Sequence, residues 1–150
     1  MKSIINRLIQ HEQLNKNEAY EILTEIAKGK HNHSLISSFL TIYMMRSISL
    51  NELEGFRQAL LELCISVDLS DYETIDLCGT GGDGKDTFNI STLSSFIVAG
   101  SGIKVSKHGN YGVSSGCGSS NVLEFLGVNF SNNESFIKKT IEKSGICFLH

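Results

Sequence analysis

The sequence lacks several features that would assign a protein to a class at once. It has no run of Lys or Arg, and its formal net charge is −3, so nothing indicates a general affinity for nucleic acid. No window approaches the roughly 18 apolar residues of a membrane span. The N-terminal stretch MKSIINRLIQHEQ is interrupted by polar residues and does not read as a signal peptide. With 150 residues and 41% hydrophobic composition, the chain is predicted to be a soluble globular protein with a substantial core.

Cysteine and histidine spacing gives no sign of a disulfide framework or a metal site. The four cysteines are scattered without a C-x-x-C: Cys64, Cys78, Cys117 and Cys147. We expect reduced thiols in a cytoplasmic protein. His31 and His33 form an H-x-H, but they lie in a polar turn with no Cys or acidic partner nearby, so no metal role is expected.

The uneven distribution of glycine divides the chain into two regions. Residues 1–70 hold two of the fourteen glycines, whereas residues 76–127 hold eleven. We therefore expect a helical N-terminal domain over 1–70 and the first part of an α/β domain over 71–150.

The first region has the apolar spacing of four helices joined by short connections. Two capping-box pairs mark helix starts: Asn15 with Glu18, and Ser49 with Glu52. Ser34 is expected to cap a third helix over 35–45, which is apolar nearly all round and is therefore expected to be buried.

The second region alternates between strand and helix patterns. Strands are expected over 74–78, 103–106 and 146–149. Helices are expected over 90–99, 120–126 and 132–143, the last with Ser131 and Glu134 as a capping box. This alternation predicts a mainly parallel sheet whose two glycine-rich loops lie at the carboxyl ends of the strands, where ligands bind.

The first loop, DLCGTGGDGKDTFNIST, matches two common phosphate motifs only in part. Gly79-x-Gly81-x-x-Gly84 fits the dinucleotide pattern, but no acidic residue lies about 20 positions on. Gly79-x-x-x-x-Gly84-Lys85 resembles a Walker A loop, but Asp86 stands where Ser or Thr should hold Mg²⁺. A glycine-rich turn without a ligand remains the structural alternative.

The residues after the loop favour a different anion site. Asn89, Ser91 and Thr92 open a helix whose first N–H groups and hydroxyls can receive a phosphate. Acidic residues in the loop can accept from ribose hydroxyls or from water on Mg²⁺. The second loop, VSKHGNYGVSSGCGSS, adds Lys107 as a cation for phosphate. It also offers His108 and Asn110 as polar groups that could orient a second, smaller substrate.

Three blocks together, GTGGDGKDTFNIST, KHGN and GSSNVLEFLG, resemble the anthranilate phosphoribosyltransferase family of tryptophan biosynthesis. They occur in the family's order and spacing over about residues 70–130, and residues 1–70 match the family's helical domain. The pyrimidine nucleoside phosphorylases share the architecture, but their glycine loop begins differently from Cys78-Gly79-Thr80-Gly81-Gly82-Asp83.

The resemblance implies transfer of the 5-phosphoribosyl group from phosphoribosyl pyrophosphate to the amino group of anthranilate, with Mg²⁺ and release of pyrophosphate. The phosphoribosyl pyrophosphate would contact Gly79, Thr80, Gly81, Gly82, Asp83, Thr87, Asn89, Ser91, Thr92, Lys107 and Ser119. Anthranilate would meet Gly79, His108 and Asn110, and Ser91 would also bind magnesium. No catalytic side chain is assigned beyond electrostatic help from Lys107, since the amine is already a nucleophile.

The resemblance also brings expectations about what differs and what is absent. Tyr111 and Asn121 stand where many members carry Arg and Asp. Family members are about twice as long, so the sheet should be incomplete here. An arginine for the anthranilate carboxylate and an Asp-Glu magnesium pair would lie beyond residue 150. A non-catalytic phosphoribosyl-pyrophosphate-binding or association module is therefore the alternative. Family members dimerise through the helical domain, so a homodimer involving Ile4, Leu8 and the third helix is expected.

Overall fold

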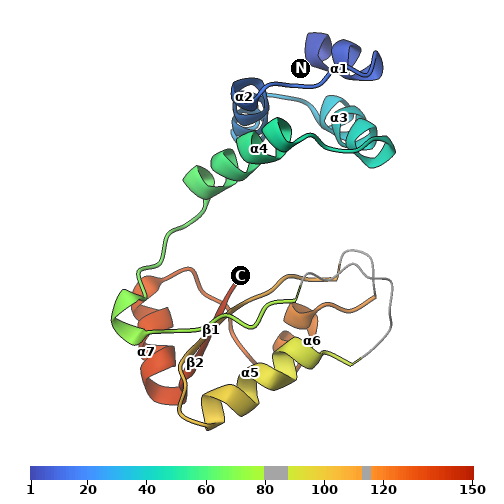
Figure 1. Ribbon diagram of the computed structural model, residues 1–150. Coiled ribbons are helices and arrows are strands. Elements are labelled where there is room, and N and C mark those ends of the chain that lie inside the picture. Colours follow the sequence, from blue (N-terminus) through green and yellow to red (C-terminus); the bar gives the residue numbers. More distant parts are fainter. Residues whose placement is uncertain (80–87, 113–115) are drawn as a thin grey trace. The chain divides into compact units, whose positions relative to one another are not determined.

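The computed structural model describes residues 1–79, 88–112 and 116–150. The chain divides into two compact units, Met1–Ile65 and Ser66–His150. The first unit is all-helical and the second combines helices with a parallel pair of strands (Figure 1). No helix in the described ranges is long and apolar enough to cross a membrane.

The first unit contains four helices: α1 (Lys2–Ile9), α2 (Lys16–Ala27), α3 (His33–Met45) and α4 (Leu50–Leu63). Both predicted capping boxes are confirmed. The side chains of Asn15 and Ser49 accept from the backbone N–H of the N3 residue, and the side chains of the N3 glutamates, Glu18 and Glu52, accept from the backbone N–H of the N-cap residue. The predicted Ser34 cap is wrong. Asn32 caps α3 by accepting from Leu35 N at 2.9 Å, which starts the helix two residues earlier, and Asn is at least as good a cap as Ser.

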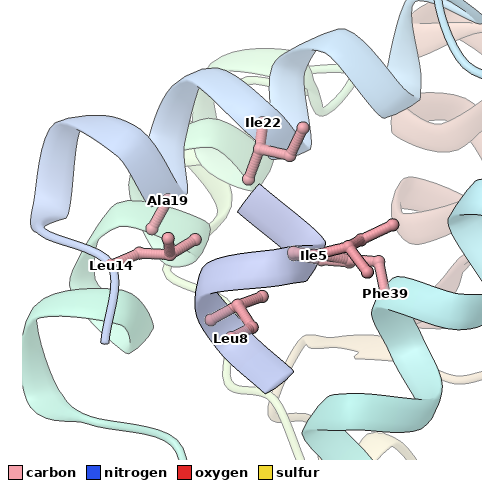
Figure 2. Packing of buried hydrophobic residues seen from close by; sticks show 6 residues of the cluster. All are labelled: Ile5, Leu8, Leu14, Ala19, Ile22 and Phe39. Carbon is pink, nitrogen blue, oxygen red and sulfur yellow. The ribbon is translucent and has the colours of Figure 1, made fainter. Parts of the chain in front are cut away.

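One apolar cluster holds the helical unit together (Figure 2). Its buried members are Ile5, Leu8, Leu14, Ala19, Ile22 and Phe39. Helices α2 and α4 approach closely at Gly55, where an added Cβ would lie 2.3 Å from the Lys16 carbonyl oxygen. The absence of a side chain at Gly55 therefore permits this packing.

Helix α3 was predicted to be buried because it is apolar nearly all round, and this prediction is wrong. Phe39 is its only buried residue, while Leu40 and Met44 are 54% and 86% exposed. These two lie one turn apart and form an outer face, because the cluster covers only the side that carries Phe39. Leu8 is 1% exposed and Ile4 packs against the cluster. The expectation that these two residues meet another chain is therefore wrong for Leu8.

A buried carboxylate on α4 ties other parts of this unit together. Glu52 is fully buried and accepts from Leu14 N at 3.0 Å and Tyr43 OH at 2.9 Å. It also forms an ion pair with Arg46. Burial alone would raise the pKa of Glu52, but the bonds from Arg46, Leu14 and Ser49 outweigh it and lower that pKa to about 2.

The described part of the second unit holds a short 3₁₀ turn, three helices and two strands. They are η1 (Ser70–Tyr72), α5 (Ile90–Gly100), β1 (Val105–His108), α6 (Ser119–Phe125), α7 (Glu134–Ser144) and β2 (Ile146–Leu149). Helix α7 is capped by Asn133, which accepts from Phe136 N at 3.0 Å. The predicted capping box of Ser131 with Glu134 is wrong for the same reason as Ser34: a nearby Asn is the cap.

The strands run parallel, as the sequence predicts. Val105 pairs with Ile146 and His108 with Leu149. The predicted strand over 74–78 is reduced to a single parallel bridge between Ile75 and Val105. The second strand lies two residues later than predicted, at Val105–His108, so Lys107 and His108 belong to the strand itself.

Alternate residues of β2 face different helices. Cys147 and Leu149 belong to the cluster of Ile137 and Ile141 on α7, whereas Phe148 lies 5.9 Å, centroid to centroid, from Phe96 of α5. Residues of a strand alternate between its faces, so α7 and α5 cover opposite sides of β2. Burial raises the pKa of the Cys147 thiol to about 11.

Candidate functional site

The candidate site lies at the carboxyl end of β1 and at the amino end of α5, both in the second unit. Five predicted site residues lie outside the described residues: Thr80, Gly81, Gly82, Asp83 and Thr87. The others are described, and they form two groups.

The first group joins the start of the first glycine loop to α5. An added Cβ on Gly79 would lie 3.0 Å from Ser91 Oγ, so the predicted pair is brought together. Asn89 caps α5, and its side chain accepts from Thr92 N at 3.3 Å. Ile90 N donates to Phe88 O at 2.8 Å. The first turn of α5 thus offers an anion fewer N–H groups than predicted, because Asn89 and Phe88 already accept two of them.

Thr92 adds a hydroxyl group to this end of α5. Its side chain is 5% exposed, and in the described part of the chain its Oγ1 has no hydrogen-bond partner. Thr24 in α2 carries a similar orphan hydroxyl. Since a buried hydroxyl without a partner is unfavourable, the Thr92 hydroxyl can donate a hydrogen bond to a ligand oxygen, as the sequence predicts for a pyrophosphate.

The second group centres on Lys107, which is 3% exposed. Its Nζ donates to the His108 carbonyl oxygen at 3.1 Å, which uses one of the three N–H donors of an ammonium group. Within residues 1–79, 88–112 and 116–150, no carboxylate lies within ion-pair distance of Nζ. Lys107, Ser119 and Ser120 are neighbours around a packed gap that has no room for a water molecule, so the predicted cation and hydroxyl lie together.

The second glycine loop folds tightly against the start of α6. An added Cβ on Gly109 would lie 2.6 Å from Ser119 Oγ, and one on Gly118 would lie 2.4 Å from Gly112 N. Asn110 O accepts from Ser120 N at 3.2 Å. The backbone contacts at Gly118 leave no room for a side chain there, which explains why the loop needs this glycine, whereas at Gly109 the Ser119 side chain would have to move.

The two departures from the family pattern both make contacts within this loop. Asn121 Oδ1 accepts from Gly112 N at 3.0 Å and from Gly118 N at 2.9 Å, so it joins two stretches of the loop as an acceptor. An Asp could accept the same two bonds. Tyr111 OH donates to Glu124 Oε1 at 2.7 Å, and this bond raises the pKa of Tyr111. This bond holds Tyr111, which directly follows Asn110, against α6.

Two side chains near the site were assigned no role from the sequence. Asp76 pairs with His108 Nδ1, and Ser120 is 1% exposed beside Lys107. Asp76 could have been noticed from its spacing, because Thr74 and Asp76 are polar residues at alternate positions in an apolar stretch.

The described residues are compatible with Mg²⁺ as a partner of the substrate, but they do not form a metal site by themselves. Among them no group of three His, Cys, Asp or Glu side chains could hold a metal ion. Magnesium prefers oxygen ligands, and the hydroxyl of Ser91 beside Gly79 could supply one. His31 pairs with Glu25 at 2.8 Å, so the expectation that it has no acidic neighbour is wrong.

Family models match nearly the whole chain. Residues 2–64 match the helical bundle domain of the glycosyl transferase family, and residues 71–150 match its a/b domain. Anthranilate phosphoribosyltransferases from Flavobacterium psychrophilum and Bacteroides fragilis are 67% and 50% identical over all 150 residues. The chain covers 46% and 45% of these relatives, about half their length.

A solved structure agrees with the sequence matches. The crystal structure of anthranilate phosphoribosyltransferase from Thermus thermophilus is 32% identical, with a TM-score of 0.78. It matches 97% of this chain and 44% of that one. The chain therefore belongs to the glycosyl transferase family, and it is similar over its whole length to the anthranilate phosphoribosyltransferases.

Proposed function

We propose that this chain carries the phosphoribosyl-pyrophosphate side of an anthranilate phosphoribosyltransferase of tryptophan biosynthesis. The observation that carries the proposal is the buried ammonium group of Lys107, which lies close to Ser119. A buried cation without a carboxylate partner in the described chain suits a phosphate oxygen. The relatives named above bear the same activity in their names.

In this proposal the residues bind and orient the reactants. Lys107 and Ser119 contact phosphate oxygens, while Gly79, Asn89, Ser91 and Thr92 receive the pyrophosphate end. His108 and Asn110 face anthranilate, whose amine attacks C1 of the ribose as the bond to pyrophosphate breaks. Lys107 stabilises the negative charge that develops on the departing pyrophosphate.

Magnesium belongs to the same proposal. When bound, Mg²⁺ would neutralise charge on the pyrophosphate, with the Ser91 hydroxyl as one ligand. Asp83, which lies outside the described residues, stays a predicted contact of phosphoribosyl pyrophosphate.

A non-catalytic binding module is the alternative, and the named relatives favour the enzyme. Because the chain spans about half the length of those relatives, catalysis by these residues alone is the part of the proposal that most needs a test. Binding and turnover must therefore be measured separately.

Calorimetric titration with phosphoribosyl pyrophosphate and Mg²⁺ tests binding, with ATP and NAD as comparators. We expect saturable heat for phosphoribosyl pyrophosphate alone, and a loss of that heat in Lys107→Met. Lys104→Met is the matched control, because Lys104 lies over the Tyr72 ring and outside the proposed site. Binding without turnover would support the module, and a folded chain that binds nothing would contradict both proposals.

Association and compartment are further proposals. We propose a homodimer through the outer face of α3, where Leu40 and Met44 are exposed. Sedimentation should give a dimer mass that Met44→Asp lowers, and a monomer at every concentration would contradict this. Cytoplasmic location is proposed from the reduced cysteines.

A further inference from the structure

A polar pair connects the segment before the first glycine loop to the end of β1. Asp76 pairs with Nδ1 of His108, and on the same two segments Thr74 Oγ1 lies 2.9 Å from Ser106 Oγ. Ile75, which lies between Thr74 and Asp76, forms a parallel bridge with Val105. Since alternate residues of a strand share a face, these two side-chain pairs form a short polar ladder on one side of the strands.

The pair determines which nitrogen of His108 carries the hydrogen. An ionised carboxylate only accepts hydrogen bonds, so Asp76 requires a hydrogen on Nδ1. A neutral imidazole ring then presents Nε2 as an acceptor. The His108 side chain is 61% exposed, and within the described residues no hydrogen bond to Nε2 is formed.

The neighbouring groups indicate what Nε2 would accept from. His108 follows Lys107 at the carboxyl end of β1, the end at which parallel sheets bind ligands. Lys107 supplies only donors and suits an anion, whereas His108 held in this form supplies an acceptor. An amine carries N–H donors, so a ligand amine could donate a hydrogen bond to Nε2 of His108.

We infer that Asp76 is a positioning residue, which holds His108 in the Nδ1–H form so that Nε2 accepts from the amine of the acceptor substrate. The inference rests on the proposed function for the identity of that amine. It assigns no proton transfer to His108, only the orientation of the amine by a hydrogen bond. Because exposed ion pairs contribute little to stability, losing the pair should alter the acceptor side and leave folding unchanged.

The hydrogen position can be read directly by ¹⁵N NMR of the imidazole nitrogens in the 150-residue chain at alkaline pH. We expect the Nδ1–H form at His108 in the unaltered chain, and a mixture of both forms in Asp76→Ala. Asp71→Ala is the control, because it removes the same charge from an exposed position in η1. An Nε2–H form in the unaltered chain, or no change in Asp76→Ala, would overturn the inference.

Kinetics then test whether Asp76 acts through His108. Asp76→Ala should raise the KM for anthranilate about three- to ten-fold, the range for a lost hydrogen bond, and leave the KM for phosphoribosyl pyrophosphate unchanged. In a His108→Ala background the same substitution should have no further effect. An equal effect in both backgrounds would contradict the inference, and Asp76→Leu, which also removes the acceptor, repeats the test if the alanine variant does not fold.

The two proposals can fail separately. If the unaltered chain transfers no phosphoribosyl group, the enzymatic proposal fails. The hydrogen position at His108 is still read from the same sample, without turnover. Calorimetry with anthranilate then tests the acceptor role, and equal affinity in the unaltered and Asp76→Ala chains would overturn it.

Discussion

The two units differ in whether a buried charged side chain has a partner of opposite charge among the described residues. In the helical unit, Glu52 is fully buried but accepts bonds from Arg46, Tyr43 and Leu14. In the second unit, Lys107 is nearly as buried, yet its ammonium group has one carbonyl partner and no carboxylate within the described chain. A buried charge with partners is tolerated and is costly to break apart, whereas an unneutralised one is unfavourable unless a ligand completes it. The contrast separates a residue of the scaffold, Glu52, from a residue of the proposed site, Lys107.

Removing Glu52 should give the largest change in stability. Glu52→Ala leaves the Arg46 guanidinium, whose side chain is only 13% exposed, without its carboxylate partner and should lower the free energy of unfolding of the helical unit by about 3–5 kcal/mol. Denaturant unfolding followed by amide hydrogen exchange in α2 and α4 would measure it. Glu54→Ala on the same helix is the control, because its pair with Lys16 is half exposed and should change stability by less than about 1 kcal/mol. Equal losses in both variants would contradict the contrast.

Acid should weaken the helical unit through the same carboxylate. The folded pKa of Glu52 is lowered to about 2, below the unfolded value of about 4.3. A lowered folded pKa stabilises the fold above the unfolded pKa, and that stability is lost as pH falls toward the folded pKa. Unfolding free energies should therefore fall between about pH 4.3 and about pH 2. In Glu52→Gln this dependence should become shallower, and an unchanged slope would rule out the assigned cause.

Lys107→Met should separate stability from binding. The apolar side chain removes a buried ammonium group, so stability should stay equal or rise. Affinity for phosphoribosyl pyrophosphate should fall about 100-fold or more, as for a lost electrostatic contact to a charged group. Parallel thermal unfolding and calorimetry would measure both quantities. A destabilised variant with unchanged affinity would place Lys107 in the scaffold and remove the contrast.

Gly118→Ala should disturb the second loop by a smaller amount. The new Cβ would lie 2.4 Å from Gly112 N and 2.7 Å from Asn110 O, so the backbone must shift. We expect about 1–3 kcal/mol of lost stability in the second unit and weaker anthranilate binding. Gly116→Ala is the matched control because, among the residues that the structure describes, no atom lies within 4 Å of its added Cβ. A Gly116→Ala effect as large as that of Gly118→Ala would mean that close packing is not the cause.

Thr92 and Thr24 allow the comparison with the smallest expected effects, and it tests whether an effect on binding is specific to the proposed site. Thr92→Val and Thr24→Val each remove a buried hydroxyl that has no partner in the described residues. Both should leave stability equal or raised by up to about 1 kcal/mol. Only Thr92→Val should weaken phosphoribosyl pyrophosphate binding, by about three- to ten-fold for one hydrogen bond. A similar loss of affinity in Thr24→Val would show that the effect does not come from the site.

Local signals in the sequence were sufficient for much of the fold. The capping boxes at Asn15 and Ser49 satisfy specific N–H groups, so sequence spacing predicts them well. Ser34 and Ser131 failed because an Asn nearby competes for the same role. The exposure of α3 could not be predicted, since composition does not say how many neighbours cover a helix.

The candidate site was predictable by residue type but not by partner. Lys107 with Ser119, and Gly79 with Ser91, were assigned from motif resemblance, and the fold brings each pair together. The pairing of Asp76 with His108 depends on strand register across 32 residues, which no local pattern encodes. The capping of α5 by Asn89 likewise involves a residue predicted to bind ligand.

The order of the two units along the chain has a consequence for synthesis. All the side chains that close the helical cluster precede Ile65, so this unit can fold while the rest of the chain is still being made. Strand β1 pairs with β2 only when Ile146–Leu149 has been synthesised. Until then the edge of β1 that pairs with β2 has unpaired backbone N–H and C=O groups, which are open to solvent and to other nascent chains. The segment that carries the proposed site is therefore the one that most needs protection on the ribosome.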